Sequence, residues 1–279
     1  MTDTFQASRV AFLGAGNMAG AIFGGMLESG YPASAIVATA RSESRRREIA
    51  EQYGIRTEAD NAAAVADADV VVLAVKPQMM RELCLSLRDA VQQRRPLIVS
   101  VAAGLTIETL EGWLGGELAV VRCMPNTPSL VGAGASGLYA NDRVDASQHK
   151  IATELFESVG LVEWVEREAQ IDAVAAISGS GPAYFFLFME SLEAAGIELG
   201  LPPDSARRLA LQTAHGAAAL ASQSEFDPAE LRRRVTSPNG TTERAIAAFE
   251  EGDLAGLVEK ATHAAAARAR ALSQELSQA

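Results

Sequence analysis

The sequence predicts an α/β fold, in which an N-terminal, doubly wound, Rossmann-like sheet is followed by an all-helical C-terminal domain. Short apolar runs alternate with segments of helical spacing through the first half of the chain. A glycine-rich turn, Gly14–Ala19, follows the first apolar run, and from about Ala169 onward every segment has helical spacing. We therefore predict two domains, spanning residues 1–167 and 168–279.

The predicted strands are apolar on both faces, as buried parallel strands are. They span Val10–Leu13, Ile36–Thr39, Val70–Val75, Leu97–Val101, Leu118–Cys123, Gly137–Ala140 and Leu161–Val165. The helices expected among them span Met18–Glu28, Glu43–Tyr53, Gln78–Val91, Thr106–Leu114 and Ala146–Val159. This alternation is typical of a parallel sheet with right-handed crossovers.

The second half is predicted to be helical and rich in apolar surface. Its expected helices span Ile171–Ile177, Ala183–Leu199, Ser205–Ala221, Pro228–Val235, Thr242–Glu250 and Gly252–Leu276. A cluster of glycine and serine, Ser178–Gly181, precedes the long apolar helix. Its missing side chains are explained equally well by a close neighbouring helix and by the nicotinamide end of a cofactor. So much apolar helical surface predicts a partner subunit.

Charge and cysteine content exclude several classes of function. The 279 residues carry a net charge of −11, which disfavours nucleic acid and anionic membranes as partners. The two cysteines, Cys84 and Cys123, form no disulfide framework and no metal-ligand pattern, so we expect no metal. The chain shows no signal-peptide pattern and no apolar run of 18 residues, and we expect a cytoplasmic protein.

The turn after the first strand reads Gly14-Ala15-Gly16-Asn17-Met18-Ala19, a G-x-G-x-x-A pattern. The first glycine permits the tight turn, the second allows a pyrophosphate to approach the backbone, and the small alanine allows close packing. The N–H groups at the start of the next helix attract the phosphate. Between a strand and a helix, the pattern predicts dinucleotide binding, although a tight turn without a ligand remains the alternative.

The end of the second strand favours NADPH, with NADH possible. An NAD site usually has an acidic residue there, but this strand ends in Arg41 and Ser42, and the first acid is Glu43. With Arg45, these residues suit a 2′-phosphate, because the guanidinium fork donates two hydrogen bonds. The alternative is that both arginines are simply exposed.

Two further strand ends are expected to line the same crevice, because ligands of open α/β sheets lie beyond the carboxyl ends of the strands. Their residues are Ala74, Val75, Lys76, Pro77, Val101, Ala102 and Ala103. Lys76 suits a phosphate or ribose contact, or it is a surface lysine. The loop Met124–Pro128, stiffened by two prolines, follows a third strand end.

The chain lacks an obvious general base for alcohol oxidation. Its three lysines are Lys76, Lys150 and Lys260, and none lies in the first helices of the second domain. Reduction of an imine fits better, because the substrate nitrogen can be protonated before binding. The loop Ser237–Thr242 precedes a helix whose N-terminus suits a small carboxylate. Capping of that helix by Thr242, with no ligand, explains the loop equally well.

Several stretches together resemble the pyrroline-5-carboxylate reductase family. They are "FLGAGNMAGAI", "VVLAVKPQ", "VAAGLTIETLEGWL", "VRCMPNTPSLVGAGASGLYA", "IDAVAAISGSGPAYFF" and "PAELRRRVTSPNGTTERAIAAFE". The resemblance implies reduction of 1-pyrroline-5-carboxylate to L-proline with NAD(P)H. It also implies a second domain like the C-terminal domain of 6-phosphogluconate dehydrogenase, which forms dimers that can assemble into rings, commonly of ten chains.

The resemblance also implies site residues. The nucleotide site would include Gly14, Ala15, Gly16, Asn17, Met18, Arg41, Ser42, Asn61, Ala74, Val75, Lys76, Pro77, Val101, Ala102 and Ala103. The substrate would contact Glu168, Gly240, Thr241 and Thr242, with the Thr242 hydroxyl bonded to the imine nitrogen as the catalytic contact. Asn239 stands where many members have glycine; since asparagine tolerates left-handed angles, we expect the turn to survive. Reduction of a related imine or keto acid, and nucleotide binding without catalysis, are the alternatives.

Overall fold

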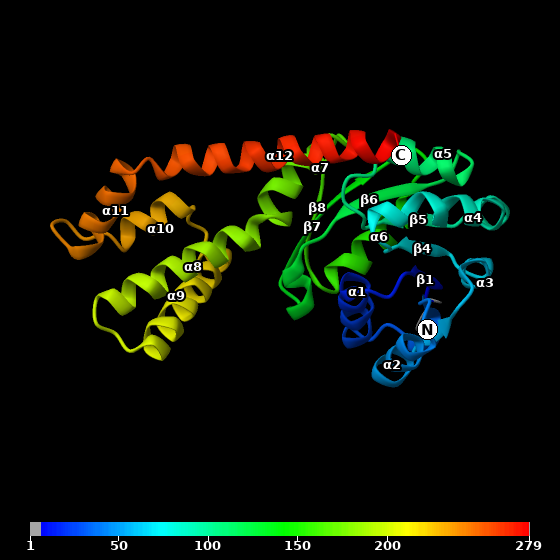
Figure 1. The fold of residues 1–279 in the computed structure, drawn as a ribbon, viewed down its shortest axis with the longest axis horizontal. Helices are drawn as coiled ribbons and strands as arrows, with labels where there is room; N and C mark the ends of the chain where they lie inside the picture. Colours follow the sequence, from blue (N-terminus) through cyan, green and yellow to red (C-terminus); the bar gives the residue numbers. More distant parts are fainter. Residues whose placement is uncertain (1–6, 279) are drawn as a thin grey trace. The chain divides into compact units, whose positions relative to one another are not determined.

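The computed structural model describes residues 7–278 (Figure 1). The chain divides into two compact units: the sheet unit, which runs up to Ser180 and includes the chain from Ala265 onward, and the helical unit, Gly181–Ala264. This division by packing falls later than the domain boundary predicted between residues 167 and 168. The reason is that helix α7 (Gln170–Val174) packs on the sheet, where the Val174 side chain occupies the space beside Gly137.

The sheet has eight strands in the order β3-β2-β1-β4-β5-β6-β7-β8. They span Val10–Leu13 (β1), Ile36–Thr39 (β2), Arg56–Glu58 (β3), Val70–Leu73 (β4), Leu97–Ser100 (β5), Val120–Met124 (β6), Gly134–Ala140 (β7) and Gly160–Trp164 (β8). All neighbours are parallel except β6 and β7. The order of the first six strands is that of a doubly wound dinucleotide-binding sheet, which confirms the predicted fold class.

Helices cover both faces of this sheet and create two apolar cores. Their bounds are Asn17–Glu28 (α1), Glu43–Tyr53 (α2), Asn61–Ala66 (α3), Met80–Arg94 (α4), Ile107–Leu114 (α5) and Ala146–Glu157 (α6), with short turns at Ala33–Ala35 (η1), Pro77–Met79 (η2) and Thr127–Val131 (η3). Alternate residues of β1 enter opposite cores: Val10 and Phe12 pack with α1 and α6, and Ala11 and Leu13 with α3, α4 and α5. This two-sided burial explains why the strands read as continuous apolar runs.

The structure differs from the sequence prediction in three places. Strand β3 and helix α3 were not predicted, because β3 is a three-residue edge strand without an apolar run and α3 has only six residues. Strand β7 runs antiparallel to β6, although parallel strands were expected. The segment between them holds only the short turn η3, too little chain for the crossover that a parallel pair requires.

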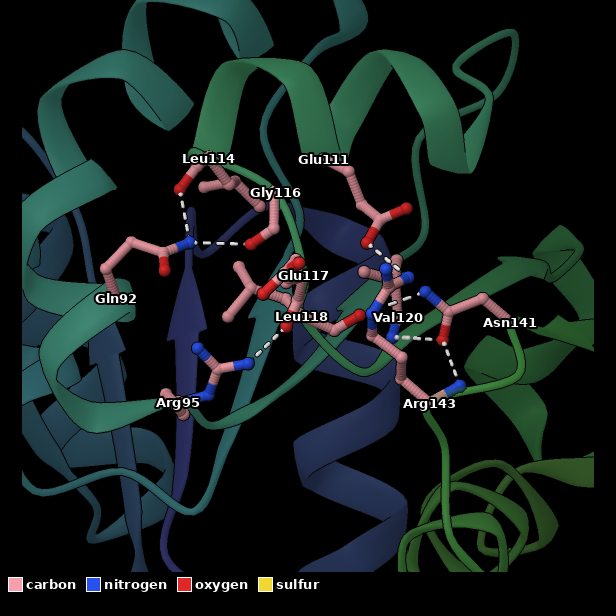
Figure 2. Close-up of polar contacts among 10 residues, drawn as sticks. All are labelled: Gln92, Arg95, Glu111, Leu114, Gly116, Glu117, Leu118, Val120, Asn141 and Arg143. Atoms are coloured by element: carbon pink, nitrogen blue, oxygen red, sulfur yellow. Dashed lines mark hydrogen bonds and ion pairs between the residues drawn. The ribbon is translucent and has the colours of Figure 1, made fainter.

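Polar side chains hold the connection from α5 to β6 (Figure 2). Gly115 and Gly116 in this connection both have positive φ. The Gln92 amide donates to the carbonyl oxygens of Leu114 and Gly116 at 3.0 and 2.8 Å. The Asn141 amide donates to the Leu118 carbonyl at 2.9 Å. The glycines make the tight turn possible and the two amides satisfy its carbonyls, which fixes where β6 begins.

The helical unit confirms the prediction that the second half is helical. A π-helical turn, Ala175–Gly179 (η4), leads into helices at Gly181–Glu198 (α8), Pro203–Gln223 (α9), Pro228–Arg234 (α10), Thr241–Glu251 (α11) and Leu254–Gln278 (α12). Helices α8 and α9 pack together as a hairpin (Figure 1). Large apolar side chains of α8 remain exposed, among them Phe185, Phe186 and Leu187 at 65%, 62% and 65%.

One helical stretch, Gln170–Glu198, is long and apolar enough to cross a membrane, with a mean hydropathy of 1.3. The sequence had been expected to contain no such stretch, because only uninterrupted apolar runs were counted. A single stretch of this kind is weak support for membrane insertion, since the core helix of a water-soluble protein has the same length and composition.

Candidate functional site

The glycine turn has the geometry that its motif predicts. Gly14 has φ +97°, and a Cβ there would lie 2.9 Å from Val75 Cγ1. Gly16 caps α1 with extended backbone, and a Cβ there would meet nothing within 4 Å. No side chain caps α1 at Gly16, so the first N–H groups of the helix remain available to a ligand. Ala19 is buried against the sheet, as expected for its small size.

A cleft of about 370 Å³ opens beside this turn. It is lined by Gly14, Ala15, Thr39, Ala40, Arg41, Ala59, Asn61, Val75, Met79, Glu82, Leu83 and Ser86. Five of the predicted nucleotide residues therefore line one hollow: Gly14, Ala15, Arg41, Asn61 and Val75. The cleft lies beyond the carboxyl ends of β1, β2 and β4, which is where ligands of such sheets bind.

Several cleft residues were not predicted from the sequence. The Thr39 hydroxyl, buried at the end of β2, accepts a hydrogen bond from the Gly14 N–H at 3.2 Å. A polar residue at the end of an apolar strand was the only available signal. Met79 and the start of α4 form the opposite wall. Met79 and the first turn of α4 directly follow the "VKPQ" segment in the sequence. Their position next to predicted site residues was the signal by which they could have been included in the site.

The arginines after β2 have different surroundings. Arg41 is exposed, and within residues 7–278 its guanidinium makes no hydrogen bond or ion pair. The Ser42 hydroxyl caps α2 by accepting from the Arg45 N–H at 3.3 Å. Arg45 donates to the Ala15 carbonyl and pairs with Glu48. Two arginines, Arg41 and Arg45, were predicted to bind a phosphate. Of these, only Arg41 has a guanidinium without a hydrogen-bond or ion-pair partner among the described residues.

The two other predicted strand ends adjoin the turn. The Ala74 N–H donates to the Leu13 carbonyl and the Val101 N–H to the Leu73 carbonyl, so β1, β4 and β5 end side by side. The Ala102 side chain is buried in the core, which leaves only its backbone for a ligand. Lys76 is exposed ahead of η2.

The residues present fit a dinucleotide phosphate. Open space lies over Gly16, the start of α1 has no side-chain cap, and Arg41, which lines the cleft, has no acceptor for its guanidinium among the described residues. Together these features provide backbone N–H donors and one free positive charge. The other ten predicted residues do not line this cleft, and their contacts with a cofactor stay predictions: Gly16, Asn17, Met18, Ser42, Ala74, Lys76, Pro77, Val101, Ala102 and Ala103.

The loop after β6 is hydrogen-bonded to the π-helical turn η4. The buried Asn126 amide donates to the Ser178 carbonyl at 3.0 Å, and its oxygen accepts from the Ala135 N–H at 2.9 Å. A Cβ on Gly179 would lie 2.6 Å from the Met124 Cε, whereas one on Gly181 would meet nothing. Internal packing therefore explains Gly179, and Gly181 retains open space.

Glu168 has firm contacts inside the sheet unit. Its carboxylate accepts from the Ile107 N–H at 2.8 Å, at the start of α5, and from Arg122 at 3.2 Å. The Arg122 side chain is buried and also faces Asp172 at 3.9 Å. The Glu168 carboxylate is thus already bound by Ile107 and Arg122. Its predicted contact with the substrate stays a prediction.

The predicted substrate loop lies in the helical unit. Helix α11 begins at Thr241 with Gly240 as its N-cap, so neither Thr241 nor Thr242 caps it. Neither hydroxyl has a hydrogen-bond partner in the described part of the chain. A Cβ on Gly240 would lie 2.9 Å from the Ser237 carbonyl oxygen, which explains the glycine. Asn239 has φ +62°, so the left-handed turn survives there as predicted.

Comparison with known proteins gives matches over nearly the whole chain. A family model described as pyrroline-5-carboxylate reductase dimerisation matches residues 168–272, and one described as NADP oxidoreductase coenzyme F420-dependent matches residues 9–104. Pyrroline-5-carboxylate reductase of Pseudomonas aeruginosa is 53% identical over 97% of this chain and 98% of its own. That of Vibrio alginolyticus is 47% identical over 96% and 99%.

Solved structures agree. A pyrroline-5-carboxylate reductase from Coxiella burnetii superposes with a TM-score of 0.93 and is 46% identical, covering 96% of this chain and 99% of its own. The Plasmodium falciparum pyrroline carboxylate reductase with NADP bound has a TM-score of 0.83 and 28% identity, covering 95% and 98%.

Proposed function

Since the chain belongs to the pyrroline-5-carboxylate reductase family, we propose that it reduces 1-pyrroline-5-carboxylate to L-proline with NADPH, the last step of proline biosynthesis. The observation that carries this proposal is the 53% identity to a reductase of that name over 97% of the chain. The glycine turn and its cleft support it, because the reaction requires a nicotinamide cofactor.

The cofactor is NADPH, and NADH is expected as a weaker substitute. The matching NADP oxidoreductase model and the NADP-bound relative support this assignment. In this chain, Arg41 would hold the 2′-phosphate with the Ser42 hydroxyl, and the N–H groups at the start of α1 would hold the pyrophosphate. When bound, the reduced nicotinamide supplies the hydride that saturates the C=N bond.

The substrate is a small cyclic imine with one carboxylate, and the start of α11 suits it. The helix N-terminus favours an anion by about 0.3–1 kcal/mol when exposed and up to about 2 kcal/mol when partly buried. No side chain caps the N–H groups at the start of α11, and both threonine hydroxyls lack partners among the described residues. We propose that Gly240 and Thr241 hold the carboxylate and that Thr242 bonds the imine nitrogen.

Binding and alignment are the main tasks of these residues. A protonated imine carbon is already electrophilic, so no side chain needs to remove a proton from carbon or oxygen before reduction. This agrees with the absence of a lysine from the first helices of the second domain. Glu168 was predicted to contact the substrate, and that contact remains part of the proposal.

Absorbance at 340 nm tests the proposal directly. The purified protein is expected to oxidise NADPH when 1-pyrroline-5-carboxylate is added, and not with the cofactor alone. Thr242→Ala is expected to lower kcat/KM about tenfold to a hundredfold, the range for one lost hydrogen bond to a charged group, while NADPH binds as before. Ser205→Ala on α9 is the matched hydroxyl control. Cofactor binding without any turnover would refute the assignment.

The chain self-associates, as its match to the dimerisation model indicates. The exposed apolar side chains of α8 are suited to burial against a second copy. Assembly of five such dimers into a ring of ten chains, and a cytoplasmic location, complete the proposal. Light scattering of the purified protein distinguishes a dimer from the ring.

A further inference from the structure

The three consecutive arginines of α2, Arg45 to Arg47, do not form a uniformly solvated helix face. The Arg45 Nε and Nη2 atoms both donate to the Ala15 carbonyl oxygen at 3.2 Å. Arg46 Nη1 donates to the Ala40 and Arg41 carbonyls at 2.7 and 2.9 Å. Arg47 contacts only Glu43 of its own helix, at 3.0 Å, and is 68% exposed. Two of the three side chains therefore bond to the backbone of residues that line the cleft.

These contacts fix the direction of specific peptide groups. In a trans peptide the carbonyl and the next N–H point in opposite directions within one plane. Holding the Ala15 carbonyl therefore also fixes the Gly16 N–H, which has no hydrogen-bond partner among the described residues. In the same way, Arg46 fixes the peptides on both sides of Arg41, and with them the backbone from which that side chain projects.

We propose that Arg45 and Arg46 are positioning residues with separate tasks in the cofactor site. Arg45 orients the glycine turn that meets the pyrophosphate, and Arg46 orients the Arg41 turn that meets the 2′-phosphate. This inference rests on the proposed cofactor. Arg45 acts through the backbone, because Nε and Nη2 are bound to Ala15 and Nη1 pairs with Glu48 at 2.8 Å. Glu48 thereby holds the guanidinium plane against the turn.

The two tasks predict different coenzyme profiles. NADPH and NADH share the pyrophosphate, and only NADPH carries the 2′-phosphate. Arg45→Met is therefore expected to raise the dissociation constants of both coenzymes by a similar factor, about tenfold for one lost charge-assisted contact. Arg46→Met is expected to raise that of NADPH by about the same factor and to leave that of NADH within about twofold. Arg47→Met is the matched control and should change neither.

Equilibrium titration followed by the coenzyme's fluorescence measures these constants without turnover. Hydrogen exchange of the cofactor-free protein adds a second readout: Arg45→Met should speed exchange of the Gly14 and Gly20 amides, which bond to Thr39 and Gly16 around the turn, and Arg47→Met should not. Arg45→Lys keeps the charge but lacks the planar fork, so it should behave like Arg45→Met. It also serves as the test if the methionine variant does not fold.

Wild-type affinity for both coenzymes in Arg45→Met, or in Arg45→Lys, would overturn the role of Arg45. Equal losses for NADPH and NADH in Arg46→Met would overturn the division of tasks. A wild-type protein that binds NADPH but does not reduce 1-pyrroline-5-carboxylate would refute the proposed function and leave these binding results standing.

Discussion

At the scale of single residues, the two glycines of the first turn are required for different reasons. Gly14 has φ +97°, and its missing side chain makes room for Val75 and Ala74. Gly16 has φ −80°, which any residue adopts, and its surroundings are open. The first glycine therefore serves the fold and the second serves the ligand.

Substituting each glycine separates these roles. Gly14→Ala is expected to lower the free energy of unfolding by about 1–3 kcal/mol, because it combines backbone strain with a steric clash. Gly16→Ala should change it by less than about 0.5 kcal/mol, yet weaken NADPH binding, because the methyl group occupies the approach to the backbone. Urea unfolding and coenzyme titration measure the two effects. Equal stability losses in both variants would contradict this explanation.

Sequence could predict the residue types of the cofactor site better than their roles. The glycine turn and Arg41 were identified because spacing and charge reveal them. The roles of Arg45 and Arg46 were not, since a run of arginines shows only that the segment is polar. Which carbonyl each guanidinium reaches depends on the path of two turns that are far apart in the sequence.

At the scale of secondary-structure elements, one buried arginine joins a strand to two helices. Arg122 lies in β6, and its guanidinium meets Glu168 and Asp172, which precede and belong to α7. Glu168 also accepts from the first N–H of α5. A buried guanidinium is expensive without its partners, so the packing of these helices depends on the two carboxylates.

Glu168→Gln therefore tests an element-scale prediction. The amide oxygen can still accept from Ile107 and Arg122, which share one oxygen of Glu168, but the negative charge is lost, so Asp172 at 3.9 Å becomes the remaining carboxylate partner of Arg122. We expect the free energy of unfolding to fall by about 1–3 kcal/mol, less than for a fully buried pair because Glu168 is 25% exposed. Glu157→Gln, on the exposed end of α6, is the control. Unchanged stability with a raised KM for substrate would instead indicate a direct substrate contact.

Most elements could be predicted because their burial is periodic. Strands buried on both faces read as apolar runs, and the helices that cover them show one apolar stripe. Strand β3 and helix α3 lack both signals. The antiparallel direction of β7 follows from the short connection after β6, which the strand's own residues do not reveal.

At the scale of the whole molecule, the proposed reaction depends on two features that the sequence predicted separately. The sheet unit provides a cleft beside a glycine turn, and the helical unit provides a helix start with accessible backbone and two unpaired hydroxyls among the described residues. The described chain divides into two compact units, and this division lies later in the chain than the predicted boundary and assigns residues 265–278 to the sheet unit. The packing of the C-terminal end of α12 on the sheet unit was not predicted. It depends on contacts of Leu272 and Leu276 beside Gly104, which is far away in the sequence.

The central claim is that the substrate's carboxylate binds where α11 begins while its ring faces the nicotinamide. A crystal structure of the protein with the oxidised coenzyme and L-proline tests this most directly. We predict carboxylate oxygens beside Gly240 and within hydrogen-bond distance of the backbone N–H groups of Thr241 and Thr242, with the ring nitrogen at the Thr242 hydroxyl. Proline bound away from these residues, beside a correctly seated coenzyme, would contradict the account.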